Sequence, residues 1–115
     1  MAQSITLKGS AKVPGASTFQ TISWTGDASY PNPAGYILTP SLFNFPGGRF
    51  KGVPRIMPAT AAALAWDYAI VPTWDANNEY ITQYALHLAV STTGVEVANG
   101  VNVAAAALTI EAEGN

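Results

Sequence analysis

The chain has 115 residues, of which 49% are hydrophobic and 10% charged, with a net charge of −2 and no cysteine. This length suits one domain with a single core, and the lack of cysteine excludes a disulfide framework, a thiolate metal site and a cysteine nucleophile. No run of 18 apolar residues occurs, and the N-terminus lacks the basic and apolar segments of a signal peptide. Neither a membrane span nor an export signal is therefore expected.

Charged residues are far fewer than the roughly 25% of an ordinary domain. Charge usually keeps a small surface in solution, so this chain either relies on Ser, Thr, Asn and Gln or covers much of its surface with partners. We favour a mixture of the two, with symmetric self-association or docking on a larger body. Residues 1–55 carry a net charge of +4 and residues 56–115 carry −6. Either strands of the two halves are neighbours and neutralise each other, or a positive surface of one copy meets a negative surface of another. Neither favours a nucleic-acid partner, which would need a basic excess.

The first half of the chain predicts short strands separated by turns. Residues 4–8 alternate polar and apolar side chains and predict a strand, followed by a loop over residues 9–17 with Pro14 and Gly15. Residues 18–25 are rich in β-branched and aromatic side chains and predict a second strand. A loop follows, and a brief strand is expected over residues 35–38.

The middle of the chain is punctuated by proline and glycine. Thr39 followed by Pro40 predicts the start of a helical turn, with Thr39 as its cap. Residues 45–50 contain Pro-Gly-Gly and predict a turn. Residues 52–58 predict an edge strand, because Pro54 and Pro58 lack the N–H that an interior strand needs.

Residues 65–90 predict a long β-hairpin around which the rest of the chain is organised. Both arms alternate large and small side chains with the period of two that marks half-buried strands. Residues 75–78 read Asp-Ala-Asn-Asn, which favours a turn. The large residues are expected to form the centre of the core: Trp66, Tyr68, Ile70, Tyr80, Tyr84, Leu86, Leu88 and Val90.

The C-terminal segment is ambiguous. A short strand is expected over residues 95–97, with turns on either side. Residues 104–107 are alanines, which favour helix, whereas Leu108 and Ile110 alternate with polar residues and favour strand. We choose a strand, because the remainder is all-β. The predicted fold is therefore an all-β, single-domain β-sandwich or flattened barrel of about six to eight antiparallel strands over residues 1–115, with residues 1–17 as a partly extended N-terminal arm.

Nothing in the sequence assembles a catalytic or metal site. His87 is the sole histidine, no G-x-S-x-G motif occurs, and no partner is placed beside it by sequence. We interpret it as a solvent-facing or interface residue. Residues 75–79 look like half of a calcium loop but lack its glycine and distant glutamate, so we interpret them as a turn. No catalytic residue, metal or cofactor is predicted, and the protein is not expected to be an enzyme.

Residues 43–55 combine three of the five cations with three phenylalanines. The phenylalanines either plug one end of the sandwich beneath solvated cations, or belong to a docking surface, where aromatic residues and arginine are enriched. Trp74, at the end of the hairpin, is a further candidate, whereas Trp24 and Trp66 are expected in the core. The candidate contacts with a partner or another subunit are Phe43, Phe45, Arg49, Phe50, Lys51, Arg55 and Trp74.

Three short segments resemble small structural proteins of tailed bacteriophages, the capsid decoration or cement proteins. They read Gly-Asp-Ala-Ser-Tyr-Pro at residues 26–31, Leu-Thr-Pro-Ser-Leu at 38–42 and Glu-Val-Ala-Asn-Gly at 96–100. The family usually has Thr-Gly-Gly after Tyr-Pro, where this chain has Asn-Pro-Ala-Gly at residues 32–35. The resemblance spans roughly residues 20–113 and implies a β-sandwich body without catalytic residues.

What the resemblance implies is a role on the outer surface of the capsid. There the protein would bridge neighbouring subunits of the major capsid protein and stabilise the shell. We expect a homo-oligomer, trimer or dimer, in the virion, with no nucleic-acid or membrane partner. The alternative is a carbohydrate- or host-surface-binding module of a virion that stacks sugars on exposed aromatic residues such as Trp74 or Tyr30. A small hydrolase is the third hypothesis and lacks the catalytic sets it would need.

Overall fold

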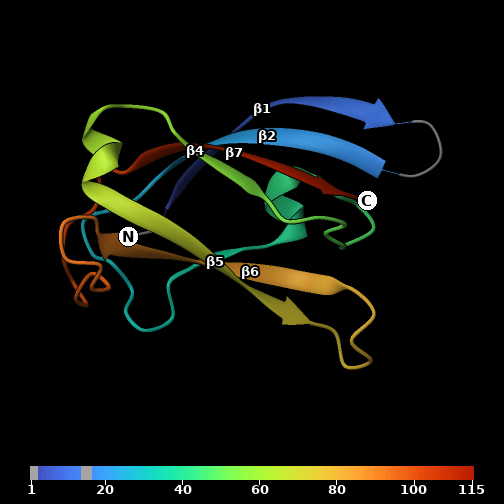
Figure 1. The fold of residues 1–115 in the computed structure, drawn as a ribbon. Coiled ribbons are helices and arrows are strands. Elements are labelled where there is room, and N and C mark those ends of the chain that lie inside the picture. The colour runs from blue at the N-terminus through green and yellow to red at the C-terminus, as the bar shows by residue number, and fades with distance from the viewer. Residues whose placement is uncertain (1–2, 14–16) are drawn as a thin grey trace.

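The computed structural model describes residues 3–13 and 17–115. Within these residues, seven strands form two antiparallel sheets that face each other as two layers (Figure 1). One sheet has the order β1-β2-β7-β4 and the other β3-β6-β5. The strands are β1 (Ser4–Val13), β2 (Ser17–Thr25), β3 (Tyr36–Leu38), β4 (Arg55–Pro58), β5 (Trp66–Trp74), β6 (Ile81–Val90) and β7 (Ala107–Gly114). The predicted single-domain β-sandwich is confirmed.

The first strand is longer than its alternating segment predicts. It pairs with β2 from Ser4 to Val13, with an irregularity between Leu7 and Gly9. Residues 9–13 were expected to be a loop, and this is wrong, because β2 supplies ladder partners for all five of them. The turn expected around Pro14 and Gly15 lies outside the described residues, as do the first two residues of the expected arm.

The C-terminal strand lies inside the four-stranded sheet. β7 pairs with β2 on one side and with β4 on the other, so the strand interpretation of this segment is confirmed over Ala107–Gly114. Leu108, Ile110 and Ala112 point into the core and are buried. β4 is an edge strand, as its prolines predict.

The predicted hairpin is also confirmed, although its two arms differ in burial. Tyr84, Leu86 and Leu88 of β6 are buried, because β6 is the middle strand of its sheet. The inward residues of β5 are only half-buried, since β5 is an edge strand without a further neighbour. Trp66, expected in the core, is therefore half-buried, whereas Trp24 is fully buried as expected.

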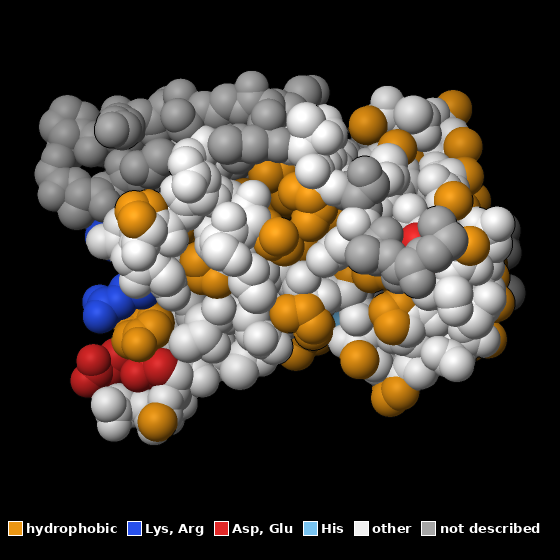
Figure 2. Space-filling model, turned by 180° about the vertical axis from the view of Figure 1, so that it is seen from behind, with side chains coloured by type: hydrophobic (Ala, Val, Ile, Leu, Met, Phe, Trp, Pro, Cys, Tyr) orange, Lys and Arg blue, Asp and Glu red, His pale blue; other side chains and the backbone are white. Residues whose placement is uncertain are grey.

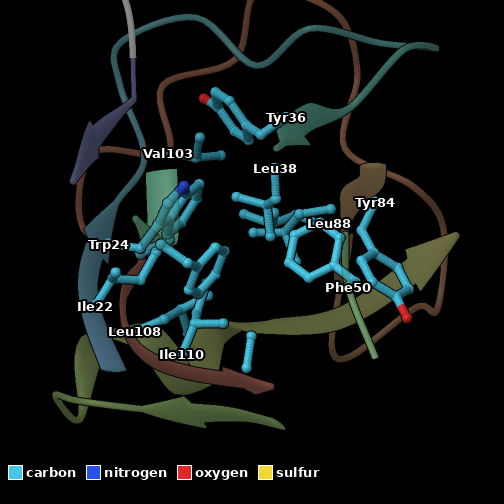
Figure 3. Close-up of a cluster of buried hydrophobic side chains, with 14 of the residues drawn as sticks. Ile22, Trp24, Tyr36, Leu38, Phe50, Tyr84, Leu88, Val103, Leu108 and Ile110 are labelled. Carbon is cyan, nitrogen blue, oxygen red and sulfur yellow. The ribbon is translucent and has the colours of Figure 1, made fainter. Parts of the chain in front are cut away.

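The core lies between the two sheets. Figure 3 shows Ile22, Trp24 and Ile110 reaching toward Leu38 and Leu88. The Trp24 and Tyr36 rings meet edge to face with centres 5.1 Å apart, an arrangement that aromatic quadrupoles favour. Two 3₁₀ helices, η1 (Pro40–Phe43) and η2 (Ala62–Ala65), complete the fold. η1 begins at Pro40 as predicted, although Thr39 makes no side-chain capping hydrogen bond.

The phenylalanines of residues 43–50 fill one end of the sandwich. Phe43, Phe45 and Phe50 are 0%, 3% and 3% exposed, and their ring centres lie 5.6–6.0 Å apart. This confirms the first of the two interpretations for these residues. While the fold is intact, their side chains are not available to a partner.

The two oppositely charged halves of the chain are neighbours, as the first charge interpretation expected. Arg55 of β4 lies opposite Glu111 of β7 in the ladder, and the backbone N–H of Lys51 donates to the carbonyl oxygen of Glu113 at 2.8 Å. Among the cations whose side chains the structure describes, however, Arg49, Lys51 and Arg55 have no carboxylate within 4.0 Å. At these three residues the proximity reduces long-range repulsion without forming close ion pairs.

Candidate functional site

A groove of about 570 Å³ lies where the hairpin ends, between residues 49–53 and the facing ends of β5 and β6. Figure 2 shows this end of the molecule at the lower left, where cationic and acidic side chains lie next to each other. The groove brings together four of the seven predicted contact residues, namely Arg49, Phe50, Lys51 and Trp74. Phe43 and Phe45 lie in the core instead, and Arg55 is exposed on β4.

One wall of the groove is held by backbone hydrogen bonds to both sheets. The N–H of Phe50 donates to Ile81 of β6 at 3.2 Å, and that of Lys51 donates to Glu113 of β7 at 2.8 Å. Arg49 and Asn115 exchange two further bonds, at 3.2 and 3.1 Å. Residues 49–51 therefore act as a bridge between the layers, and the wall is positioned before any ligand arrives.

The floor of the groove is aromatic. The Tyr84 ring meets the buried Phe50 ring edge to face with centres 5.0 Å apart, and the Tyr84 hydroxyl donates to the carbonyl oxygen of Gly52 at 3.1 Å. Burial raises the pKa of this hydroxyl, so it remains a neutral donor near neutral pH. The floor thus consists of apolar ring surface whose polar group is already bonded.

The rim carries the groups that can contact a ligand. Trp74 is 50% exposed, and Cζ of Arg49 lies 4.3 Å from the centre of the Tyr80 ring. Such cation–π contacts contribute about 0.5–1 kcal/mol at exposed sites. Lys51 and Glu79 complete the charged rim. With two cations, one acid and an open indole, this site can bind a ligand that offers both a flat apolar face and an anionic group.

A second cluster joins residues that are distant in sequence. The Tyr30 hydroxyl donates to Oε2 of Glu96 at 2.7 Å and accepts from the N–H of Leu88 at 3.1 Å. Nδ1 of His87 lies 2.8 Å from the same oxygen of Glu96. The hydrogen bonds with His87 and Tyr30 lower the pKa of Glu96, while burial and the bond to Glu96 raise that of Tyr30.

This cluster corrects one expectation from the sequence and refines another. Tyr30 is fully buried, so it cannot stack a sugar as the alternative hypothesis suggested. His87 is half-buried and bonded to Glu96, with a hollow of about 180 Å³ beside it. No side chain placed as a nucleophile was found among the contacts of His87 in the described residues, and these residues contain no group of three metal-ligating side chains. These hydrogen bonds fasten strand β6 to the loop after β2 and to the segment that holds Glu96.

No protein-family model, curated protein or solved structure matches this chain. In the described ranges, no helix has the length and apolar character needed to cross a bilayer.

Proposed function

We propose that this protein is a structural component of a phage virion that decorates the outer surface of the capsid. It stabilises the shell by bridging subunits of the major capsid protein. The observation that carries this proposal is an apolar row on the outward face of the β3-β6-β5 sheet, which Ile37, Ala85 and Val71 form. The short segments that resemble phage decoration proteins support the same role.

The middle of this face is an apolar row across all three strands. Ile37 of β3 lies opposite Ala85 of β6, which lies opposite Val71 of β5. Ile37 is 36% and Val71 51% exposed. The flanking small residues, Ala69 and Ala89, leave the surface low, so that a flat partner can approach closely. We call Ile37, Ala69, Val71, Ala85 and Ala89 the small-residue face.

Three ionisable side chains border the small-residue face: Asp67, His87 and Glu96, which pairs with Ala89 and bonds to His87. Contiguous exposed apolar surface on a small protein usually marks a site of contact with another protein. Such a surface also accounts for a chain in which only 10% of residues are charged. The edge of β5 contains Pro72, which lacks an N–H. Contact is therefore expected through the face of this sheet rather than by strand addition at its edge.

Bridging needs no high affinity per copy. A protein that binds the assembled shell and not its free subunits stabilises the shell by mass action, and many copies on one lattice add their effects. Self-association as a dimer or trimer would let each unit reach several subunits at once. No nucleic-acid or membrane partner is part of this proposal.

Co-sedimentation with purified expanded shells of the source phage tests the proposal. Wild type should pellet with shells, and Val71→Lys should reduce the bound amount by about tenfold or more, because it places a charge in the centre of the small-residue face. The matched control is Thr21→Lys on the other sheet, where Thr21 lies opposite Glu111; it should bind like wild type. Failure of wild type to pellet, or undiminished binding of Val71→Lys, would contradict the proposal.

A further inference from the structure

We infer that the groove at the hairpin end is a carbohydrate-binding site that takes a short acidic oligosaccharide. This role goes beyond shell decoration and does not depend on it. The lining residues Phe50 and Tyr84 belong to the core side of the sheets, whereas the small-residue face points outward. Shell contact would therefore leave the groove open to a second ligand.

The groove has an exposed indole on its rim, that of Trp74. Trp74 follows an irregularity in the pairing of β5 with β6, after Thr73, and keeps half of its surface exposed while lining the groove. Trp74 is not one of the buried core residues, although Phe50 and Tyr84 on the floor of the groove are. Aromatic side chains present a flat apolar body with a polar tip, and the C–H face of a pyranose ring is a complementary surface of similar size.

Two of the five cations of the chain, Arg49 and Lys51, line this one groove together with Glu79. The carboxylate of Glu113 also lies close by, 3.6 Å from where a Cβ on Gly52 would stand. No carboxylate among the described residues lies within 4.0 Å of either cation, so both cations are available to a ligand. A guanidinium binds a carboxylate through two parallel hydrogen bonds, which favours a sugar that carries a carboxylate.

The groove has the size of a ligand-binding site and a wall that is held in place. A volume of about 570 Å³ falls within the usual range of ligand sites, about 300–1,000 Å³, and suits two or three sugar units. The wall is held to both sheets by backbone hydrogen bonds, and Arg49 is held over the Tyr80 ring. Binding therefore costs little ordering of the protein, which favours affinity from a modest number of contacts.

An array of neutral and carboxylated oligosaccharides, the latter containing uronic or sialic acids, provides the test. Wild type should bind carboxylated members in preference to neutral ones. Trp74→Ala and Arg49→Gln should each weaken binding by about tenfold or more. The matched controls remove an exposed apolar residue and an exposed arginine outside the groove, Leu64→Ala and Arg55→Gln, and should stay within about twofold of wild type.

A measurement on wild type removes any dependence on variant folding. Bound oligosaccharide should protect Trp74 from oxidation by N-bromosuccinimide, while Trp24 is protected in both states by burial. The inference is overturned if no carboxylated sugar binds, or if Trp74→Ala binds as wild type does. Equal binding of neutral sugars would overturn the acidic preference. Binding of single-stranded oligonucleotides in place of sugars would assign the groove to another class of ligand.

Discussion

The hydroxyl of Tyr30 donates a hydrogen bond at 2.7 Å to Oε2 of Glu96, a residue 66 positions later in the chain. The same hydroxyl accepts the backbone N–H of Leu88 at 3.1 Å. One side chain therefore ties the loop after β2 to strand β6 and to the segment that follows it. His87 adds a second contact to Glu96 at 2.8 Å, so four residues from three segments share one network.

Tyr30→Phe tests this network. The change leaves the buried N–H of Leu88 without its acceptor and removes one donor to Glu96. An unsatisfied buried group costs about 1–3 kcal/mol, so the free energy of unfolding should fall by that amount in urea titrations. Tyr68→Phe is the control: it removes a hydroxyl that donates to the carbonyl of Ala63 at a half-buried position, and should cost less. Equal costs would argue against the network.

Asp27 is predicted to contribute to the stability of the protein in acid. This carboxylate is 4% exposed and accepts a 2.6 Å hydrogen bond from the Tyr36 hydroxyl. That bond, followed by the one from the N–H of Ser29, holds the pKa of Asp27 below its ordinary 3.8, against the opposing effect of burial. The carboxylate of Asp27 therefore takes up a proton more readily in the unfolded chain than in the folded one. Its contribution to the free energy of unfolding is complete above pH 3.8, the ordinary pKa, and is lost as the pH falls through the lowered pKa of the folded state.

Asp27→Asn should reduce this part of the pH dependence, because an amide does not titrate in this range and can still accept a hydrogen bond. Urea unfolding at about pH 6 and about pH 2.5 measures it. Wild type should lose more stability between the two conditions than Asp27→Asn does. Parallel losses in the two proteins would show that Asp27 does not carry the effect.

The wall of the groove depends on a close approach at Gly114. A Cβ at this position would collide with the carbonyl oxygen of Arg49 and lie 2.5 Å from Cδ2 of the Phe45 ring. Gly114→Ala should therefore lower the free energy of unfolding by about 1–3 kcal/mol, as overpacking usually does. At Gly52, the nearest atom to an added Cβ is 3.6 Å away, so Gly52→Ala should be tolerated. A thermal or urea melt of both variants decides the matter.

Phe50 is predicted to matter for stability rather than for contact with a partner. Its ring meets Phe43, Phe45 and Tyr84, and truncation of a buried phenylalanine costs about 3–5 kcal/mol. Phe50→Ala should show this loss in urea unfolding. Val53, 75% exposed nearby, serves as the control, since Val53→Ala should change stability by less than about 0.5 kcal/mol. A small effect of Phe50→Ala would show that the cluster is not part of the core.

The strands were predictable where the alternation of apolar and polar residues in the sequence matches the alternation of buried and exposed side chains in the structure. Leu108 and Ile110 alternate with polar residues, and this pattern outweighed the helical propensity of the preceding alanines because β7 lies inside a sheet. The extension of β1 beyond Lys8 was not predictable, because residues 9–13 are ordered by ladder partners on β2 and not by their own pattern. The partial burial of Trp66 follows from the edge position of β5, which depends on the sheet order.

The groove could be predicted only in part. Arg49, Lys51 and Trp74 were selected as contact residues from their types and turn positions, but their shared groove requires the bridge that residues 49–51 make between the sheets. The stacking of Arg49 on Tyr80 had no signal in the sequence. The contact of Tyr30 with Glu96 was equally hidden, because sequence patterns report neighbours a few residues apart and not 66.

Hydroxyl-radical footprinting of the shell-bound protein tests most directly whether the small-residue face is covered. His87 and Val71 report on this face, and Met57, which lies opposite Thr109 on the outward side of the other sheet, is the internal reference. Labelling of His87 and Val71 should fall severalfold on binding to shells, relative to Met57. Unchanged labelling of His87 and Val71 in protein that has pelleted with shells would contradict the proposed contact.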